Sequence, residues 1–172
     1  IPEKFAGEAT SDCGAIIEGW HGDAAISIVM PDAGGDIHTL SEATQSSLWA
    51  GLAQARVGHH LSDIGHAVEE CIRGAGGYGI VEEYVGHGIG SEMHMHPPVP
   101  NYGRPGRGPR LEAGMALAIE PMVTMGTANV QVLDDQWTVV TSDGAAAAHW
   151  EHSVAITDEG PWVLTSLEGT RL

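Results

Sequence analysis

The chain has 172 residues and a mass of 18.0 kDa, which is the size of a single domain over residues 1–172. Apolar residues make up 42% and charged residues 17%. No apolar run approaches the length of a membrane helix, which needs about 20 residues. This composition excludes a disordered tail and predicts a globular protein with no membrane partner. Because 23 acidic residues oppose 7 basic ones, the net charge is −16, and we expect no nucleic-acid partner.

The excess of carboxylates occurs together with ten histidines, a combination that suits divalent cations. Cys13 and Cys71 are too few for a disulfide framework and form no Cys-x-x-Cys pair, which favours a reducing compartment. No signal peptide is visible, so we expect a cytoplasmic protein. The chain begins at Ile1 without an initiator methionine, which indicates a processed protein, a fragment or a sequence with its start missing.

The first apolar, β-branched segment is interrupted by Glu18-Gly19, a pair suited to a two-residue turn. We predict a β-hairpin with strands at 12–17 and 20–29. In this register Asp12 and Asp23 are diagonal neighbours on one face, with backbones roughly 7–8 Å apart. Both carboxylates then reach a shared site for cations, whereas the alternative is that both face water.

Two amphipathic helices are expected next. The form of a capping box from Thr39 to Glu42 predicts the first helix at about 40–56. The second helix has Ser62 as its N-cap and ends at the glycines from Gly74. Its apolar stripe consists of Ile64, Ala67, Val68, Cys71 and Ile72. The closing glycines have the spacing of a dinucleotide-binding turn, but they follow a helix instead of a strand, so we interpret them as a C-cap and loop.

Strand-like runs dominate the second half of the chain, after a proline-rich loop from Pro97 to Pro109. They lie at 115–125, 128–133, 137–141 and 148–157. The order of strands, two helices and further strands predicts an α+β fold with a mainly antiparallel sheet.

Acidic residues interrupt these apolar runs. Glu120 ends one run and is followed by Pro121, which stops ladder pairing just after the acid. Glu151 lies inside another run. A carboxylate embedded in apolar β sequence is costly to bury unless it is paired or binds metal. Together with Asp12 and Asp23, these acids indicate a shared cation in preference to four independent surface positions.

Histidines lie close to the same region of the sequence. His87 lies between glycines in the stretch 86–90, where the backbone is able to approach a site closely, although a histidine in a loop is the alternative. His94 and His96 alternate with Met93 and Met95, a pattern compatible with a soft copper site, but no further thiolate or thioether cluster supports copper.

These residues fall into motifs that occur in a fixed order between residues 12 and 165. The motifs are Asp12 with Gly14-Ala15, Gly19-Trp20-His21-Gly22-Asp23, Gly86-His87-Gly88-Ile89-Gly90 with His94, Ala118-Ile119-Glu120-Pro121-Met122, Trp137-Thr138 and Trp150-Glu151-His152. The set resembles the signature of type I, bacterial-like methionine aminopeptidases. The prolidases and proline-specific aminopeptidases of the same pita-bread metallopeptidase family share its metal pattern.

The resemblance implies a pita-bread fold, with an antiparallel sheet backed by helices, and two divalent metal ions. Asp12 would chelate one ion, Asp23 and Glu151 would bridge both, and His87 with Glu120 would complete the other. Cobalt, manganese, iron and zinc all suit such ligands.

The same likeness implies removal of N-terminal methionine from peptides and nascent proteins. Glu120 would act as general base and acid, and His94 would donate to the substrate carbonyl. Met93, Trp137 and His94 would contact substrate. A complete enzyme of this kind is expected to be a monomer.

The sequence also departs from the family. The helices and strands of the family's first half are missing, Ile1-Pro2 matches the pair that follows them, and Glu8 to Ser11 lacks apolar alternation and is one residue short. Three hypotheses follow: part of a complete aminopeptidase, a truncated and inactive or weakly active remnant, and a module that only binds metal or protein. The five intact ligand positions argue against the third.

Overall fold

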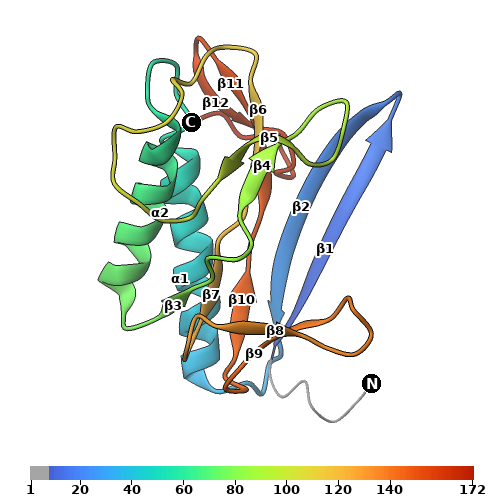
Figure 1. Ribbon diagram of the computed structural model, residues 1–172, viewed down its shortest axis with the longest axis vertical. Coiled ribbons are helices and arrows are strands. Elements are labelled where there is room, and N and C mark those ends of the chain that lie inside the picture. Colours follow the sequence, from blue (N-terminus) through green and yellow to red (C-terminus); the bar gives the residue numbers. More distant parts are fainter. Residues whose placement is uncertain (1–7) are drawn as a thin grey trace.

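The computed structural model describes residues 8–172, so the Ile1-Pro2 pair lies outside the described residues (Figure 1). The elements in chain order are β1 (Glu8–Ile17), β2 (Trp20–Val29), α1 (Gly35–Leu52), α2 (Leu61–Ala75), β3 (Gly79–Ile80), β4 (Gly86–Gly88), β5 (Met95–Val99), β6 (Ala116–Ile119), β7 (Met122–Thr124), β8 (Val130–Val132), β9 (Val139–Thr141), β10 (Ala147–His149), β11 (His152–Thr157) and β12 (Gly160–Val163). The predicted α+β class with antiparallel pairing is confirmed.

The N-terminal hairpin forms as predicted. Ile17 pairs with Trp20 around the turn, where Glu18 and Gly19 have φ values of 53° and 85°, the left-handed pair that a type I′ turn requires. β1 begins earlier than predicted, at Glu8, and pairs with β2 without a shift in register. The missing apolar alternation of Glu8 to Ser11 therefore does not disturb the ladder.

Both helices exist, but their predicted starts are wrong. α1 begins at Gly35, and Thr39 lies inside it, where its Oγ1 donates to Gly35 O at 2.9 Å. The N-cap of α2 is His60 and not Ser62. His60 forms a capping box with Asp63, whose Oδ2 accepts the His60 backbone N–H at 2.8 Å. α2 runs through Gly74 to Ala75, beyond its predicted end, and the predicted glycine C-cap is confirmed at Gly76.

Two of the predicted long strands are each broken in the middle. The run 115–125 forms β6 and β7, and the run 148–157 falls mainly in β10 and β11. Strand order is β12-β11-β6-β4-β5 in one sheet and β10-β7-β3 in the next. β6 pairs with β11 in the first sheet, and their chain neighbours β7 and β10 pair in the second, so two long interrupted strands run through both sheets. The short strands β3, β4, β5 and β12 were not predicted, and β5 overlaps the expected proline-rich loop.

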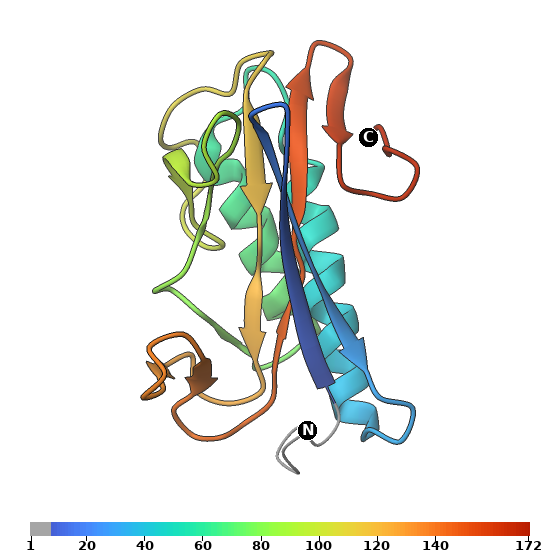
Figure 2. The same cartoon turned by 90° about the vertical axis from the view of Figure 1, so that its right-hand side faces the viewer.

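The helices cover one side of these long strands, and the hairpin β1–β2 lies on the other side (Figure 2). Apolar residues of α1, α2, β6 and β11 form the main core, and a second cluster joins the helices to β3, β7 and β10. Apolar burial of this kind is the main stabilising term of the fold. No helix among residues 8–172 is long and apolar enough to cross a membrane.

Candidate metal centre

The two strand breaks face each other. Ile119 pairs with His152 and Met122 pairs with His149, so the unpaired residues 120–121 lie opposite 150–151. Pro121 has no N–H to donate, which explains why the ladder stops there. Two long strands thus hold Glu120 and Glu151 at one interruption of the sheet.

The hairpin reaches the same place through its backbone. Glu151 N–H donates to Ala25 O at 2.9 Å, and Ala25 N–H donates to Glu151 O at 3.4 Å. Next to this pair, the Ser153 hydroxyl accepts the Asp23 N–H at 3.0 Å and donates to Asp23 O at 2.9 Å. These bonds hold the backbone of β2 around Asp23 against the start of β11.

The five residues expected to bind metal are brought together. Ligand atoms of Asp12, Asp23 and Glu151 all lie within 4.8 Å of one another, as do those of His87, Glu120 and Glu151. The two groups share Glu151. Asp12 pairs with Ala25 and Gly14 pairs with Asp23, which confirms the prediction that the two aspartates are diagonal neighbours and places both at this cluster.

His87 lies on β4, buried between β5 and β6. Its Nδ1 lies 3.0 Å from Gly88 O, which only accepts, so Nδ1 carries the proton. With Nδ1 donating, Nε2 is the nitrogen available to a metal ion, and it lies 3.5 Å from Glu120 Oε1. Two acceptors at this separation fit a cation between them.

The flanking glycines serve a different purpose from the one expected. A Cβ at Gly86 would meet Ala118 O, and a Cβ at Gly88 would meet His96 O. The close approach is therefore to the backbones of the neighbouring strands, not to the site itself.

Burial of Glu151 makes its ionised form costly without a cation. The side chain is 1% exposed, and burial, followed by the charges of Glu120, Asp23 and Asp12, raises its pKa to about 9. Burial and the neighbouring Asp12 also raise the pKa of Asp23. Within residues 8–172, Glu151 Oε1 has no hydrogen-bond partner. Divalent cations fit this arrangement, since they would neutralise the carboxylates and occupy the unpartnered oxygen.

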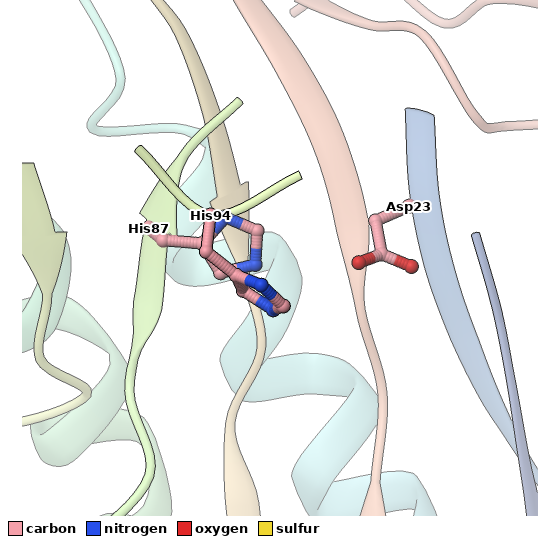
Figure 3. Close-up of side chains that lie close together, drawn as sticks. All are labelled: Asp23, His87 and His94. Carbon is pink, nitrogen blue, oxygen red and sulfur yellow. The ribbon is translucent and has the colours of Figure 1, made fainter. Parts of the chain in front are cut away.

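The predicted substrate-binding residues separate into two places. His94 is exposed, and its ring centroid lies 4.5 Å from that of His87. Potential ligand atoms of His94, His87 and Asp23 form a third close group (Figure 3). Met93 Cε lies against Gly14, next to Asp23 on the paired strand. Trp137 is 87% exposed on the β8–β9 hairpin.

An open pocket of about 330 Å³ lies beside the two imidazoles. Its described lining residues are Val85, Gly86, His87, His94, Met95, His96 and Pro98. Trp137 is not among them, so the structure does not bring this predicted residue to the pocket.

One residue of the site was missed from the sequence. His149 Nε2 lies 3.5 Å from Glu120 Oε2. Its position two residues before Glu151 was the available signal, because residues i and i+2 of an extended segment share a face.

Comparison with known proteins decides the family. A family model described as metallopeptidase family M24 matches residues 9–158. The chain belongs to metallopeptidase family M24. It is 55% identical over 159 residues to methionine aminopeptidase 1 of Mycobacterium tuberculosis, covering 90% of this chain and 60% of the relative. It is 51% identical to the methionine aminopeptidase of Clostridium acetobutylicum, and the match covers 91% of this chain and 62% of that relative.

The crystal structure of methionine aminopeptidase from Thermotoga maritima superposes with a TM-score of 0.88 at 39% identity, covering 91% of this chain and 63% of that one. This M24 chain therefore has the predicted pita-bread fold. It spans about 60% of the length of the curated relatives it matches. Family membership implies divalent metal ions, and the oxygen and nitrogen donors of the cluster fit them.

Proposed function

We propose that this M24 chain carries the catalytic centre of an aminopeptidase that removes N-terminal methionine from peptides and nascent proteins. The observation that carries the proposal is the pair of close carboxylate and imidazole groups that meet at Glu151 and are able to act as metal ligands. Similarity to methionine aminopeptidases supports the choice of methionine. We also propose that residues 1–172 form one domain, and that the protein works in the cytoplasm, where nascent chains are made.

Two divalent ions would occupy the centre. Asp12, Asp23 and Glu151 would hold one, and His87 and Glu120 would hold the other, with Glu151 and Asp23 shared between them. Support comes from the two close groups that meet at Glu151 and from the proximity of Asp23 to His87. Ions in such centres activate a water molecule and polarise the scissile carbonyl.

Glu120 would move the proton in this reaction. Its carboxylate is partly buried beside His87 and Glu151, where it is able to take a proton from the attacking water and pass it to the leaving amine. Proton transfer of this kind contributes about 10²- to 10⁴-fold in rate.

His94 would stabilise the substrate carbonyl. Its ring is exposed beside the buried His87 and borders the pocket, so a peptide at the centre would lie within its reach. A donor aimed at the developing negative charge contributes about 10²- to 10³-fold. We propose Met93, which lies beside Asp23, as a contact of the methionine side chain. The role of Trp137 in binding methionine stays a prediction from the sequence, since its side chain lies outside the pocket.

Release of free methionine from the tripeptide Met-Ala-Ser tests the function. The assay uses the chain with manganese or cobalt, and compares Met-Ala-Ser with Leu-Ala-Ser and with N-acetylated Met-Ala-Ser. We expect release from the first peptide, little from the second and none from the third, which lacks the free amine. Equal cleavage of the first two would refute methionine specificity. Metal binding without any release would instead indicate an inactive remnant or a module that only binds metal.

A further inference from the structure

Glu120 lies between two imidazoles. Oε1 is 3.5 Å from His87 Nε2, and Oε2 is 3.5 Å from His149 Nε2. All three side chains are largely buried, with 12% of Glu120, 10% of His87 and 16% of His149 exposed. The two carboxylate oxygens therefore have different neighbours.

The two histidines are not equivalent. His87 uses Nδ1 to donate to Gly88 O, which leaves Nε2 as a metal ligand. His149 Nε2 is buried and has no hydrogen-bond partner within residues 8–172, and its ring atoms join none of the three close ligand groups found there. A buried ring nitrogen of this kind needs a partner, and Glu120 Oε2 is the acceptor it faces.

The backbone holds His149 firmly at this position. His149 N–H donates to Ser27 Oγ at 3.0 Å, and Ser27 Oγ donates to His149 O at 3.1 Å. On the other side, the residue pairs with Met122 in the ladder between β10 and β7. A backbone fixed from both sides holds the attachment point of the imidazole beside Glu120, which favours a defined orientation of the neighbouring carboxylate.

We propose that His149 is a positioning residue of the metal centre: its Nε2–H donates to Glu120 Oε2 and leaves Oε1 for a cation that Glu120 and His87 would hold together. The inference rests on the proposed metal centre. Hydrogen bonds from outer residues to ligating carboxylates typically set metal affinity or activity by about 10- to 100-fold.

Cobalt binding to the metal-free chain tests this role, measured by calorimetry and by the visible absorption of the bound ion. His149→Leu removes the donor, His149→Gln keeps an N–H at a similar reach, and His149→Asn keeps an amide that ends short of Glu120. We expect His149→Leu and His149→Asn to weaken cobalt binding about 10- to 100-fold and to change the cobalt spectrum. His149→Gln should restore most of the affinity.

The outcomes separate this role from simple packing. Loss of thermal stability in all three variants, with cobalt affinity within twofold of the parent chain, would overturn the positioning role. If His149→Leu does not fold, the comparison of His149→Gln with His149→Asn decides, and equal affinities for these two would likewise overturn it. Failure of the parent chain to bind cobalt would refute the metal centre itself, and this inference with it.

Discussion

Ala25 and Glu151 exchange both backbone hydrogen bonds, although one lies in the second strand of the chain and the other lies between β10 and β11. This pair joins the N-terminal hairpin to the break between β10 and β11. Because side chains alternate along a strand, fixing Ala25 also fixes Asp23 on the same face of β2. The carboxylates of the hairpin and of the second half of the chain therefore meet through one backbone connection.

Without metal, stability should fall as pH rises from 7 to 9. Burial raises the pKa of Glu151 from its ordinary 4.5 to about 9, so over this range the folded chain keeps a proton that the unfolded chain has lost. The loss is at most about 1.4 kcal/mol per pH unit for one group. The lowered pKa of His152, caused by burial, acts only below its ordinary 6.5 and leaves this range unaffected. Urea unfolding of the metal-free chain at several pH values measures the slope.

Glu151→Gln should flatten that slope and raise metal-free stability at pH 9, because the amide has no charge to desolvate. Glu159→Gln is the matched control, since that side chain is 84% exposed. A slope that persists in Glu151→Gln would show that another group carries the proton.

Glu120→Gln and His94→Ala should lower turnover of Met-Ala-Ser far more than they lower the melting temperature. The expected losses are about 10²- to 10⁴-fold for Glu120→Gln and about 10²- to 10³-fold for His94→Ala. Metal content measured on the same samples distinguishes lost chemistry from lost metal. Near-parental turnover in either variant would disprove the role assigned to that residue.

Gly65→Ala should destabilise the fold by about 1–3 kcal/mol. A Cβ at Gly65 would meet Pro100 O and lie 2.8 Å from Tyr102 O, where α2 packs directly on the backbone of the loop after β5. In the same helix, a Cβ at Gly74 meets no described atom within 4 Å. Gly74→Ala should therefore stabilise by about 0.8–1 kcal/mol through helix propensity. Equal effects of the two substitutions in urea unfolding would contradict the close packing at Gly65.

The chain of residues 1–172 should self-associate through the hairpin β1–β2. Ile17 is 72% and Trp20 is 68% exposed, and they form a cross-strand pair beside further exposed apolar side chains. Such a patch favours association, and each large apolar side chain buried contributes about 1.5–3 kcal/mol. Ile17→Thr with Trp20→Thr should shift sedimentation velocity profiles toward monomer. A monomeric parent chain at micromolar concentration would count against this prediction.

The hairpin was predictable because its register depends on local chemistry. Glu18-Gly19 permits a two-residue turn, and the turn alone dictates that Asp12 lies opposite Ala25 and Gly14 opposite Asp23. The strand break at Glu120 was also predictable, since Pro121 cannot donate to a ladder. Both features depend on neighbouring residues.

Features that depend on distant residues escaped prediction. His60 caps α2 although histidine is not a favoured N-cap, because Asp63 and the backbone supply the bonds. The short strands β4 and β5 pair through glycines that admit neighbouring backbones, which leaves no apolar pattern to recognise. His149 belongs to the site only because β10 pairs with β7, which begins just after Glu120 and Pro121.

The number of cobalt ions bound per chain is the most direct test of the metal centre, measured by calorimetry together with elemental analysis. The account predicts two ions in the parent chain and loss of both in Glu151→Gln, since Glu151 belongs to both ligand groups. Two ions retained by Glu151→Gln, or none bound by a folded parent chain, would contradict it.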